Sequence, residues 1–296
     1  MIGPLDHGPI FITGLDHSGK TRLRLLLGRS RRLSLTRRTE LWTSPHAAHG
    51  DLSDDRSLDA CIVSLLARRP VAEMVPEPDA LRVAFRTGPA THGRLFALIH
   101  EMHAARRGAE RWGDQDSGLE LVSARVLAEL PTARVVHLVI DPRRRFASME
   151  RSVLARPGMV GAATAAWVAS VRRGTEAAAR DPSRYRLIRA ETIEDGTGTA
   201  DLLGYLGLRD LGHIAEGGPE SHAPSRIRDR DRAFVESTAR EEMASLGYAI
   251  EGRLLAGADR LRAIALHRPL GTVRYGLRMI RERASEARIR RRGEAS

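Results

Sequence analysis

The residues best suited to chemistry lie near the start of the chain, in the segment 14–21 (GLDHSGKT). This segment matches the pattern G-x-x-x-x-G-K-[ST], in which backbone amides and a lysine bind phosphate groups. Gly14 and Gly19 permit backbone angles that a Cβ would forbid, and the amides at the start of a following helix attract an anion. Lys20 adds a positive charge and Thr21 a hydroxyl group. Lys20 is also the only lysine among the 48 Lys and Arg residues. From the motif and its flanking residues we predict that this segment binds a phosphate group.

The sequence on either side predicts the elements that hold this loop. A short apolar run at 9–13 predicts a strand, and leucines at helical spacing after Thr21 predict a helix. Further strands are expected near residues 38, 111, 134 and 185, with 38–42 as the end of the second. Helices are expected at 57–68, 91–107, 118–129, 160–180 and 229–246, whereas 71–90 is expected to be irregular. This alternation predicts an α/β fold, a three-layer α/β/α arrangement with a central parallel sheet, as in P-loop NTPases.

A second motif follows the apolar strand expected at 133–140. Asp141 and Pro142 predict a helix start, because Asp is a good N-cap and Pro fits the first helical turn. An Asp at this position can instead hold magnesium in a phosphoryl-transfer enzyme. We favour the cap, because a basic helix begins here. Ligands of parallel sheets bind beyond the carboxyl ends of the strands, so this helix start and the phosphate loop are expected at the same edge.

The composition bounds the class of protein. The 296 residues are 42% hydrophobic and 29% charged, which suits one sizeable α/β domain, predicted at 1–250, with a basic tail at 251–296. No apolar run reaches the roughly 20 residues needed to span a bilayer, and residues 1–8 lack the Arg or Lys of a signal peptide. Cys61, the only cysteine, excludes an internal disulfide and a cysteine-rich zinc site. We therefore expect a cytoplasmic location.

The positive charge is concentrated at the end of the chain. Residues 251–296 hold 12 Arg against 5 Asp and Glu, so this tail carries +7 of the net charge of +11. The rest of the chain is only mildly basic and contains no zinc finger or helix-turn-helix signal, which argues against nucleic-acid binding. Leu, Ile and Val recur in the tail at helical spacing among the arginines. Such a basic amphipathic helix is compatible with peripheral membrane contact, although packing on the domain or a mobile end is the favoured interpretation.

A phosphate loop of this type serves two chemistries. The first is phosphoryl transfer or hydrolysis of ATP or GTP, which needs magnesium held by Thr21 and by an Asp such as Asp141. The second is sulfuryl transfer from 3′-phosphoadenosine 5′-phosphosulfate, which needs no metal. The loop alone does not separate them.

Several blocks of sequence, taken together, resemble bacterial sulfotransferases. Residues 9–23 resemble the family's opening pattern G-x-x-R-S-G-T-T-x-L. Residues 112–149 resemble a second block that runs from W-G-x-K-T-P to R-D-P-R-x-x-x-x-S. Trp167, the strand end at 185–191 and the pair Gly247-Tyr248 match later positions. The blocks follow the family's order through the whole predicted domain.

The resemblance implies a donor, 3′-phosphoadenosine 5′-phosphosulfate, and the residues that bind it. The family's first loop holds the 5′-phosphosulfate, which here implicates Gly14, His17, Ser18, Gly19, Lys20 and Thr21. An Arg before Asp-Pro and a Ser eight residues later hold the 3′-phosphate. The Ser is Ser148, but Ile140 occupies the Arg position, so we expect Arg143, or else Arg144 or Arg145, to supply the cation.

The resemblance also suggests three catalytic residues. Lys20 stands where the family usually has Thr, and we predict that it stabilises charge on the leaving phosphate oxygen. His17 stands at the position of a basic residue of the family. Glu40 matches a glutamate of many relatives, and we predict that it takes the acceptor's proton during in-line attack on sulfur. His46 and His49 are substitutes for this base.

The sequence thus predicts a sulfotransferase that transfers a sulfuryl group to a hydroxyl or amine of a small-molecule or glycan acceptor, without a metal. Two alternatives stay open. A P-loop kinase or NTPase is suggested by Lys20 and Thr21. A nucleotide-binding protein without turnover is suggested by Ile140 and by Gln115, which replaces the Lys of W-G-x-K-T-P.

Overall fold

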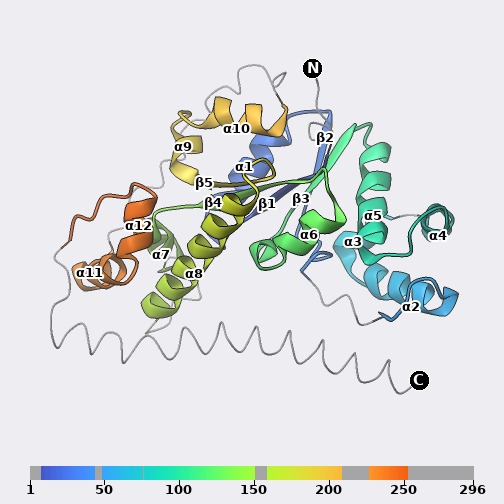
Figure 1. The fold of residues 1–296 in the computed structure, drawn as a ribbon, viewed down its shortest axis with the longest axis horizontal. Helices are drawn as coiled ribbons and strands as arrows, with labels where there is room; N and C mark the ends of the chain where they lie inside the picture. Colours follow the sequence, from blue (N-terminus) through green and yellow to red (C-terminus); the bar gives the residue numbers. More distant parts are fainter. Residues whose placement is uncertain (1–7, 44–48, 76, 151–158, 209–226, 253–296) are drawn as a thin grey trace.

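A central parallel sheet organises the computed structural model, which describes residues 8–43, 49–75, 77–150, 159–208 and 227–252. Its five strands have the order β2-β3-β1-β4-β5, and all pairs of neighbours are parallel (Figure 1). The strands are β1 (Ile10–Thr13), β2 (Leu33–Arg37), β3 (Arg111–Gln115), β4 (Arg134–Val139) and β5 (Tyr185–Arg189). The predicted α/β fold with a central parallel sheet is confirmed.

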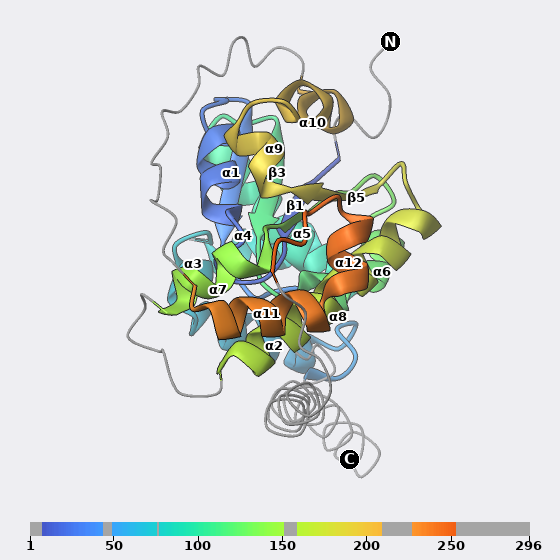
Figure 2. The same ribbon diagram turned by 90° about the vertical axis from the view of Figure 1, so that its left-hand side faces the viewer.

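Helices connect the strands and cover both faces of the sheet. In Figures 1 and 2, α10 lies on one side of the strands and α8 and α11 on the other. The helices are α1 (Lys20–Leu27), α2 (Asp55–Leu66), α3 (Arg69–Ala72), α4 (Pro78–Arg86), α5 (His92–Arg106), α6 (Ser123–Glu129), α7 (Pro142–Glu150), α8 (Met159–Arg180), α9 (Ala190–Glu194), α10 (Thr199–Leu206), α11 (Asp229–Thr238) and α12 (Arg240–Ser245), with a short 3₁₀ helix, η3, at Leu119–Leu121.

The apolar sequence of β1 explains how the two faces are packed. Successive side chains of a strand point to opposite faces, and all four residues of β1 are buried, as expected for a central parallel strand. Phe11 packs toward α2 and α5, with its ring 5.4 Å from that of Trp42 and 5.7 Å from that of Trp112. Ile10 and Ile12 pack on the other face against α1 and α10. Both layers therefore fix the strand that leads into the phosphate loop.

Three sequence-based predictions about elements were wrong in whole or in part. The second strand is Leu33–Arg37, and residues 38–42 form the loop that follows it, not the strand end. Leu33 and Ser34 are the only buried residues of this strand, so its buried part is shorter than the fully buried β1. The segment 71–90 is not wholly irregular, because it contains the end of α3 and the whole of α4, which begins at Pro78. The predicted helix at 229–246 is divided into α11 and α12 at Ala239.

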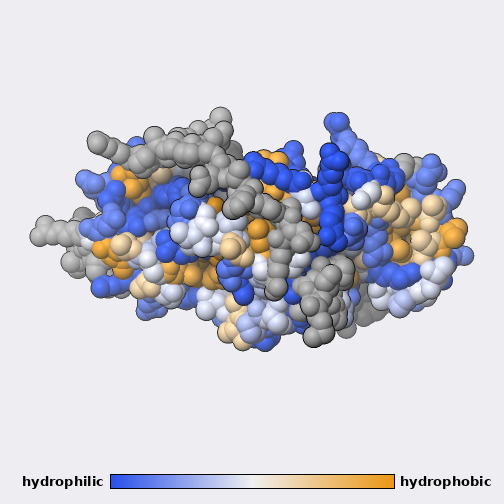
Figure 3. Space-filling model, turned by 90° about the horizontal axis from the view of Figure 1, so that it is seen from above, coloured by the Kyte–Doolittle hydropathy of each residue, from blue (hydrophilic) through white to orange (hydrophobic). Residues whose placement is uncertain are grey.

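Other regions bear on the remaining predictions. Among the residues that the structure describes, no helix is both long and apolar enough to cross a membrane. The face shown in Figure 3 is mostly hydrophilic, with smaller hydrophobic areas between the charged side chains. Most of the basic tail, residues 253–296, lies outside the described residues, as do residues 1–7. The predicted boundary at 250 and the roles of the tail therefore stay predictions.

Candidate active site

The phosphate loop joins β1 to α1 at the carboxyl edge of the sheet, as predicted. Gly14 has φ 126° and Gly19 has φ 85°, angles that favour glycine. A Cβ on Gly14 would lie 2.2 Å from the carbonyl oxygen of Leu138, so the absence of a side chain lets the loop approach β4 closely. The sequence therefore requires glycine at this position for packing as well as for backbone freedom.

Lys20 turns its side chain back into the loop. Its Nζ donates to the carbonyl oxygen of Gly14 and to Oγ of Ser117, at 2.6 Å from the latter, and lies 3.8 Å from Oδ1 of Asp16. The side chain is 5% exposed. Burial lowers the pKa of Lys20, and neighbouring carboxylates, of which Asp16 acts most strongly, oppose this shift only in part. The ammonium is therefore held within the loop by the carbonyl oxygen of Gly14 and the hydroxyl of Ser117.

Ser117 and Asp16 are site residues that the sequence did not predict. Ser117 follows β3, and its hydroxyl donates to Oδ1 of Asp16 at 2.8 Å while it accepts from Lys20. Burial raises the pKa of Asp16, but the Ser117 hydrogen bond and the charges of Lys20, Arg38 and Arg145 together lower it. Asp16 is therefore ionised at neutral pH. Its sequence signal was its place inside the loop pattern, where an acidic residue is unexpected in an anion-binding segment.

Helix α7 approaches the loop at two points. Nδ1 of His17 lies 3.0 Å from Oγ of Ser148, and Nε of Arg145 donates to the carbonyl oxygen of Asp16 at 2.9 Å. Arg145 is 6% exposed, and burial lowers its pKa to about 10. The structure thus brings together His17 and Ser148, which the resemblance assigned to the two phosphate sites of the donor, and adds Arg145 beside them.

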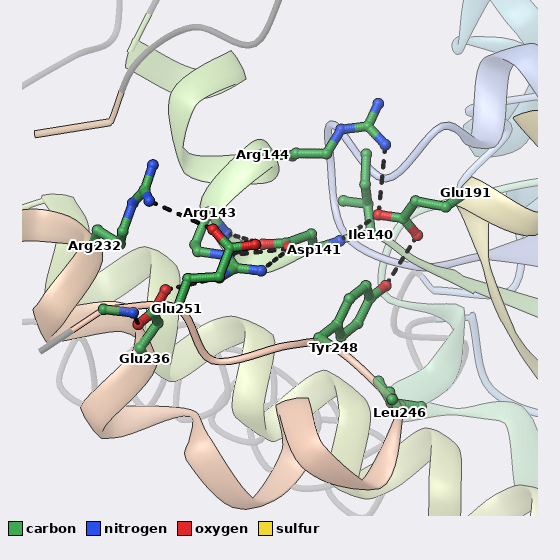
Figure 4. A network of polar contacts seen from close by, with 12 residues as sticks. Ile140, Asp141, Arg143, Arg144, Glu191, Arg232, Glu236, Leu246, Tyr248 and Glu251 are labelled. Atoms are coloured by element: carbon green, nitrogen blue, oxygen red, sulfur yellow. Dashed lines mark hydrogen bonds and ion pairs between the residues drawn. The ribbon is translucent and has the colours of Figure 1, made fainter. Parts of the chain in front are cut away.

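Arg143, the arginine favoured from the sequence for the 3′-phosphate, binds two carboxylates instead. Its guanidinium lies 2.6 Å from Oδ2 of Asp141 and 2.7 Å from Oε1 of Glu236 (Figure 4). Asp141 also accepts from the backbone amide of Arg143 at 2.8 Å, so the predicted helix cap is confirmed. Arg144 is paired with Glu194 at 2.9 Å. Of these three arginines, Arg145 is the one that contacts the phosphate loop.

Ile140 belongs to the hydrophobic core. It is 8% exposed and packs with residues of α1 and α10, and its carbonyl oxygen accepts from Nε1 of Trp167 at 2.8 Å. Glu191 also holds the start of α7, because its Oε1 accepts from the backbone amide of Asp141 at 2.8 Å while its Oε2 accepts from the hydroxyl of Tyr248 at 3.0 Å (Figure 4). The strand end is therefore fixed by packing and by hydrogen bonds that do not involve the phosphate loop.

Glu40 lies three residues after β2, in a turn with unusual backbone angles. Arg38 and Glu40 both have φ 52°, and between them Thr39 donates to Oδ2 of the buried Asp114. The Glu40 side chain is 63% exposed and pairs with Arg68 at 2.8 Å. The hydrogen bond of Thr39 anchors this turn to β3, so the position of Glu40 depends on a buried contact behind it.

In the described chain, the residues other than glycine that have a positive φ angle lie at this edge of the sheet. These residues are His17, with φ 66°, and Arg38 and Glu40. Such angles cost free energy in residues with a Cβ, and they tend to persist at functional sites. Both turns that follow β1 and β2 are therefore strained, and both carry predicted site residues.

Three buried carboxyl groups lie close to the carboxyl ends of β1 and β2. Burial raises the pKa of Asp114 to about 7, and it also raises the pKa of Asp116, to which Thr43 donates at 2.8 Å. Glu120 accepts from Thr13 at 2.5 Å. Burial raises the pKa of Glu120, but the charge of a nearby histidine and the hydrogen bond from Thr13 lower it overall. The sequence did not predict that these buried carboxyl groups belong to the site.

The remaining predicted residues are placed as follows. Ser18 is 2% exposed, and its Oγ has no hydrogen-bond partner among the described residues. This hydroxyl is therefore available to donate a hydrogen bond to an anion. Thr21 is exposed on α1, and His49 is half-buried. Gln115 is 6% exposed. His46 lies outside the described residues. Within the described ranges, no group of three or more His, Cys, Asp or Glu side chains is placed to hold a metal ion.

Comparison with known proteins gives a family-model match and several similar solved structures. The sulfotransferase family model matches residues 9–200, from before β1 into α10. The fold is similar to the sulfotransferase domain from the curacin biosynthetic pathway, at 17% identity over 87% of this chain and 96% of that chain, with a TM-score of 0.44. It is also similar to sulfotransferase STF9 from Mycobacterium avium, at 12% identity over 83% of this chain and 78% of that chain, with a TM-score of 0.45. No curated protein matches the chain.

The match to the family model covers more than half of the chain and includes the phosphate loop, both predicted phosphate-binding elements and the sheet. The chain therefore belongs to the sulfotransferase family, whose general reaction is the transfer of a sulfuryl group.

Proposed function

We propose that this protein transfers the sulfuryl group of 3′-phosphoadenosine 5′-phosphosulfate to a hydroxyl or amine of a small-molecule or glycan acceptor. The observation that carries the proposal is the contact of 3.0 Å between His17 and Ser148. It joins the loop assigned to the 5′-phosphosulfate with the helix assigned to the 3′-phosphate. A nucleotide with phosphate groups on the 3′ and 5′ positions of its ribose needs two anion sites on neighbouring elements, and a contact between these two elements supports the proposal.

The residues of the loop suit the anionic end of this donor. The amides at the start of α1, the ammonium of Lys20 and the hydroxyl of Ser18, which has no partner in the described part of the chain, are all groups that donate to phosphate or sulfate oxygens. When the acceptor oxygen attacks sulfur, a new S–O bond forms and the bond from sulfur to the phosphate oxygen breaks. Lys20 stabilises the negative charge that develops on that leaving oxygen.

The second anion site is proposed on α7. Ser148 supplies a hydroxyl, and Arg145 supplies positive charge in place of the missing arginine at Ile140. Arg143 is less suited, because its guanidinium is already paired with Asp141 and Glu236. The hydrogen bonds of Arg145, in contrast, go to the backbone carbonyl oxygens of Asp16 and Ala163.

The acceptor's proton is proposed to go to Glu40. Its carboxylate lies in the strained turn after β2, and its ion pair with Arg68 is solvent-accessible and so can open at low cost. No metal is proposed. A cytoplasmic location and contact of the basic tail with a membrane surface remain proposals as well.

Calorimetry tests the donor. We expect adenosine 3′,5′-bisphosphate to bind without metal, and more tightly than ATP with magnesium. Tighter binding of ATP, dependent on magnesium, would instead favour the kinase or NTPase alternative. Tight binding of the bisphosphate without turnover of any hydroxyl acceptor would favour a nucleotide-binding protein without catalysis.

A further inference from the structure

A negatively charged side chain lies inside the loop that is built to bind an anion. The carboxylate of Asp16 is 69% exposed, yet it is held in place by the hydroxyl of Ser117, and its backbone carbonyl is held by Arg145. The hydrogen bond to Ser117 and three neighbouring cations keep it ionised, although burial acts in the opposite direction. The loop therefore combines the charge of Lys20 with an opposing charge 3.8 Å away.

This carboxylate is close enough to act on any anion that Lys20 binds. An oxygen hydrogen-bonded to Nζ lies about 2.8 Å from it. Because Nζ is 3.8 Å from Oδ1 of Asp16, that oxygen lies within about 7 Å of the carboxylate, whatever its direction. This distance is shorter than the Debye length of about 8 Å at physiological ionic strength, so salt does not remove the repulsion.

Sulfate and phosphate groups differ in their charge, which is the property that this repulsion can distinguish. Both are tetrahedral, and both offer oxygens to the same donors. A sulfate ester carries a single negative charge, whereas a terminal phosphate has a second ionisation with a pKa of about 6 and carries nearly two at neutral pH. Shape and hydrogen bonding alone therefore separate them poorly, and a fixed negative charge separates them well.

We propose that Asp16 is a specificity-determining residue that makes the loop prefer a terminal sulfate over a terminal phosphate. Its carboxylate repels the second charge of a phosphate, as unfavourable groups do in other selective sites. This inference rests on the proposed function. It explains how a loop with a P-loop lysine can bind a sulfate donor while Asp16 disfavours nucleotides that end in a diphosphate.

The test uses two ligands that differ only in the terminal group. They are 3′-phosphoadenosine 5′-phosphosulfate and 3′-phosphoadenosine 5′-diphosphate, titrated calorimetrically without metal at pH 8. We expect the full chain to prefer the sulfate. In Asp16→Asn, affinity for the diphosphate should rise on the order of 10-fold more than affinity for the phosphosulfate, because one extra unit charge no longer faces a carboxylate.

Two further variants test whether the effect comes from the carboxylate at position 16, from the shape of that side chain or from the net charge of the protein. Asp16→Glu keeps the charge and should keep the preference for sulfate. Asp181→Asn removes one charge at the amino end of β5, where Asp181 likewise accepts from a serine hydroxyl, at 2.8 Å, and should leave both affinities unchanged. An equal change for both ligands in Asp16→Asn would overturn the inference.

The failure of the proposed function has a different signature. If the parent binds neither ligand but Asp16→Asn gains the diphosphate, the role of Asp16 stands and the assigned donor is wrong. If Asp16→Asn also fails to bind the diphosphate, the inference is overturned. Binding of the diphosphate only with magnesium, lost in Asp16→Asn, would make Asp16 a metal ligand and would likewise overturn it.

Discussion

Nζ of Lys20 donates to Oγ of Ser117 at 2.6 Å, and this bond joins the loop after β1 to the turn that follows β3. The two elements are far apart in the sequence but are neighbours in the sheet. The phosphate loop is therefore supported by a second strand, and its lysine is positioned before any ligand arrives. Such preorganisation lowers the free-energy cost of binding an anion.

Replacement of this lysine should remove donor binding. In Lys20→Ala, we expect affinity for adenosine 3′,5′-bisphosphate to fall at least about 30-fold, because truncation of one partner of a buried charged contact costs about 2–5 kcal/mol. Calorimetry measures this change. Arg144→Gln, which removes a half-exposed charge paired with Glu194, is the control and should bind as the parent does. Unchanged binding in Lys20→Ala would show that the loop is not the anion site.

The chemical reactivity of Lys20 offers an independent check. As the only lysine, it can be followed by mass spectrometry after limited labelling with an amine-directed acylating reagent. Because burial lowers the pKa of Lys20, its amine should become reactive at lower pH than a free lysine, although access is restricted. Bound adenosine 3′,5′-bisphosphate should protect it. Labelling of Lys20 that the nucleotide does not slow would contradict the site.

Loss of the proposed base should affect turnover and not donor binding. Glu40→Gln is expected to lower turnover about 10²- to 10⁴-fold, the usual contribution of a general base, while affinity for the bisphosphate changes little. The measurement is sulfuryl transfer to any acceptor found by screening. Arg68→Met tests the ion pair, since it frees Glu40 without removing it and should preserve turnover. Equal losses of binding and turnover in Glu40→Gln would argue for a structural role.

Variants of Arg143 and Arg145, two of the three arginines of α7, should fail in different ways. Arg143→Met leaves Asp141 and the buried Glu236 without their cation, and breaking such a pair destabilises a protein by about 3–5 kcal/mol. We expect lower thermal stability but an unchanged preference for adenosine 3′,5′-bisphosphate over AMP. Arg145→Met should instead reduce that preference. Melting curves and paired titrations distinguish them, and the opposite pattern would return the 3′-phosphate to Arg143.

Asp114 should make folding less favourable as the pH rises. Burial raises its pKa from 3.8 to about 7, so the folded state binds the proton more tightly than the unfolded state between these values. The free energy of unfolding therefore falls as the pH rises from about 4 to 7, by a few kcal/mol at most. Urea denaturation at pH 5 and pH 8 should show this fall in the parent and a smaller one in Asp114→Asn. The difference between the proteins isolates Asp114 from buried histidines, whose lowered pKa values act in the opposite direction.

Much of the fold was predictable because local patterns and tertiary packing agree. The apolar runs of β1 and β4, the glycines of the loop and the Asp141 cap each have one favourable conformation, and the structure adopts it. The second strand was harder, because only two of its residues are buried and its flanks are basic. In that segment the polar pattern did not mark where the strand ends.

The candidate site was predictable only where chemistry is encoded in adjacent residues. The loop and Ser148 were found through motifs, whereas Ser117, Asp16 and Arg145 gain their roles from contacts between distant segments. Choosing among Arg143, Arg144 and Arg145 needed the partners of each guanidinium. No spacing in the sequence records that Glu236 takes up the first of them.

The buried position of the chain's only lysine has a consequence for the rest of the protein. Every other positive side-chain charge that does not depend on histidine comes from arginine, whose guanidinium stays protonated in water beyond pH 12. Lysine-rich surfaces lose their charge in strongly alkaline solution, but an arginine surface does not. The electrostatic field of the exposed arginines should therefore persist far into the alkaline range, whereas the buried Lys20 and Arg145, whose pKa values burial lowers, should lose their charge at lower pH.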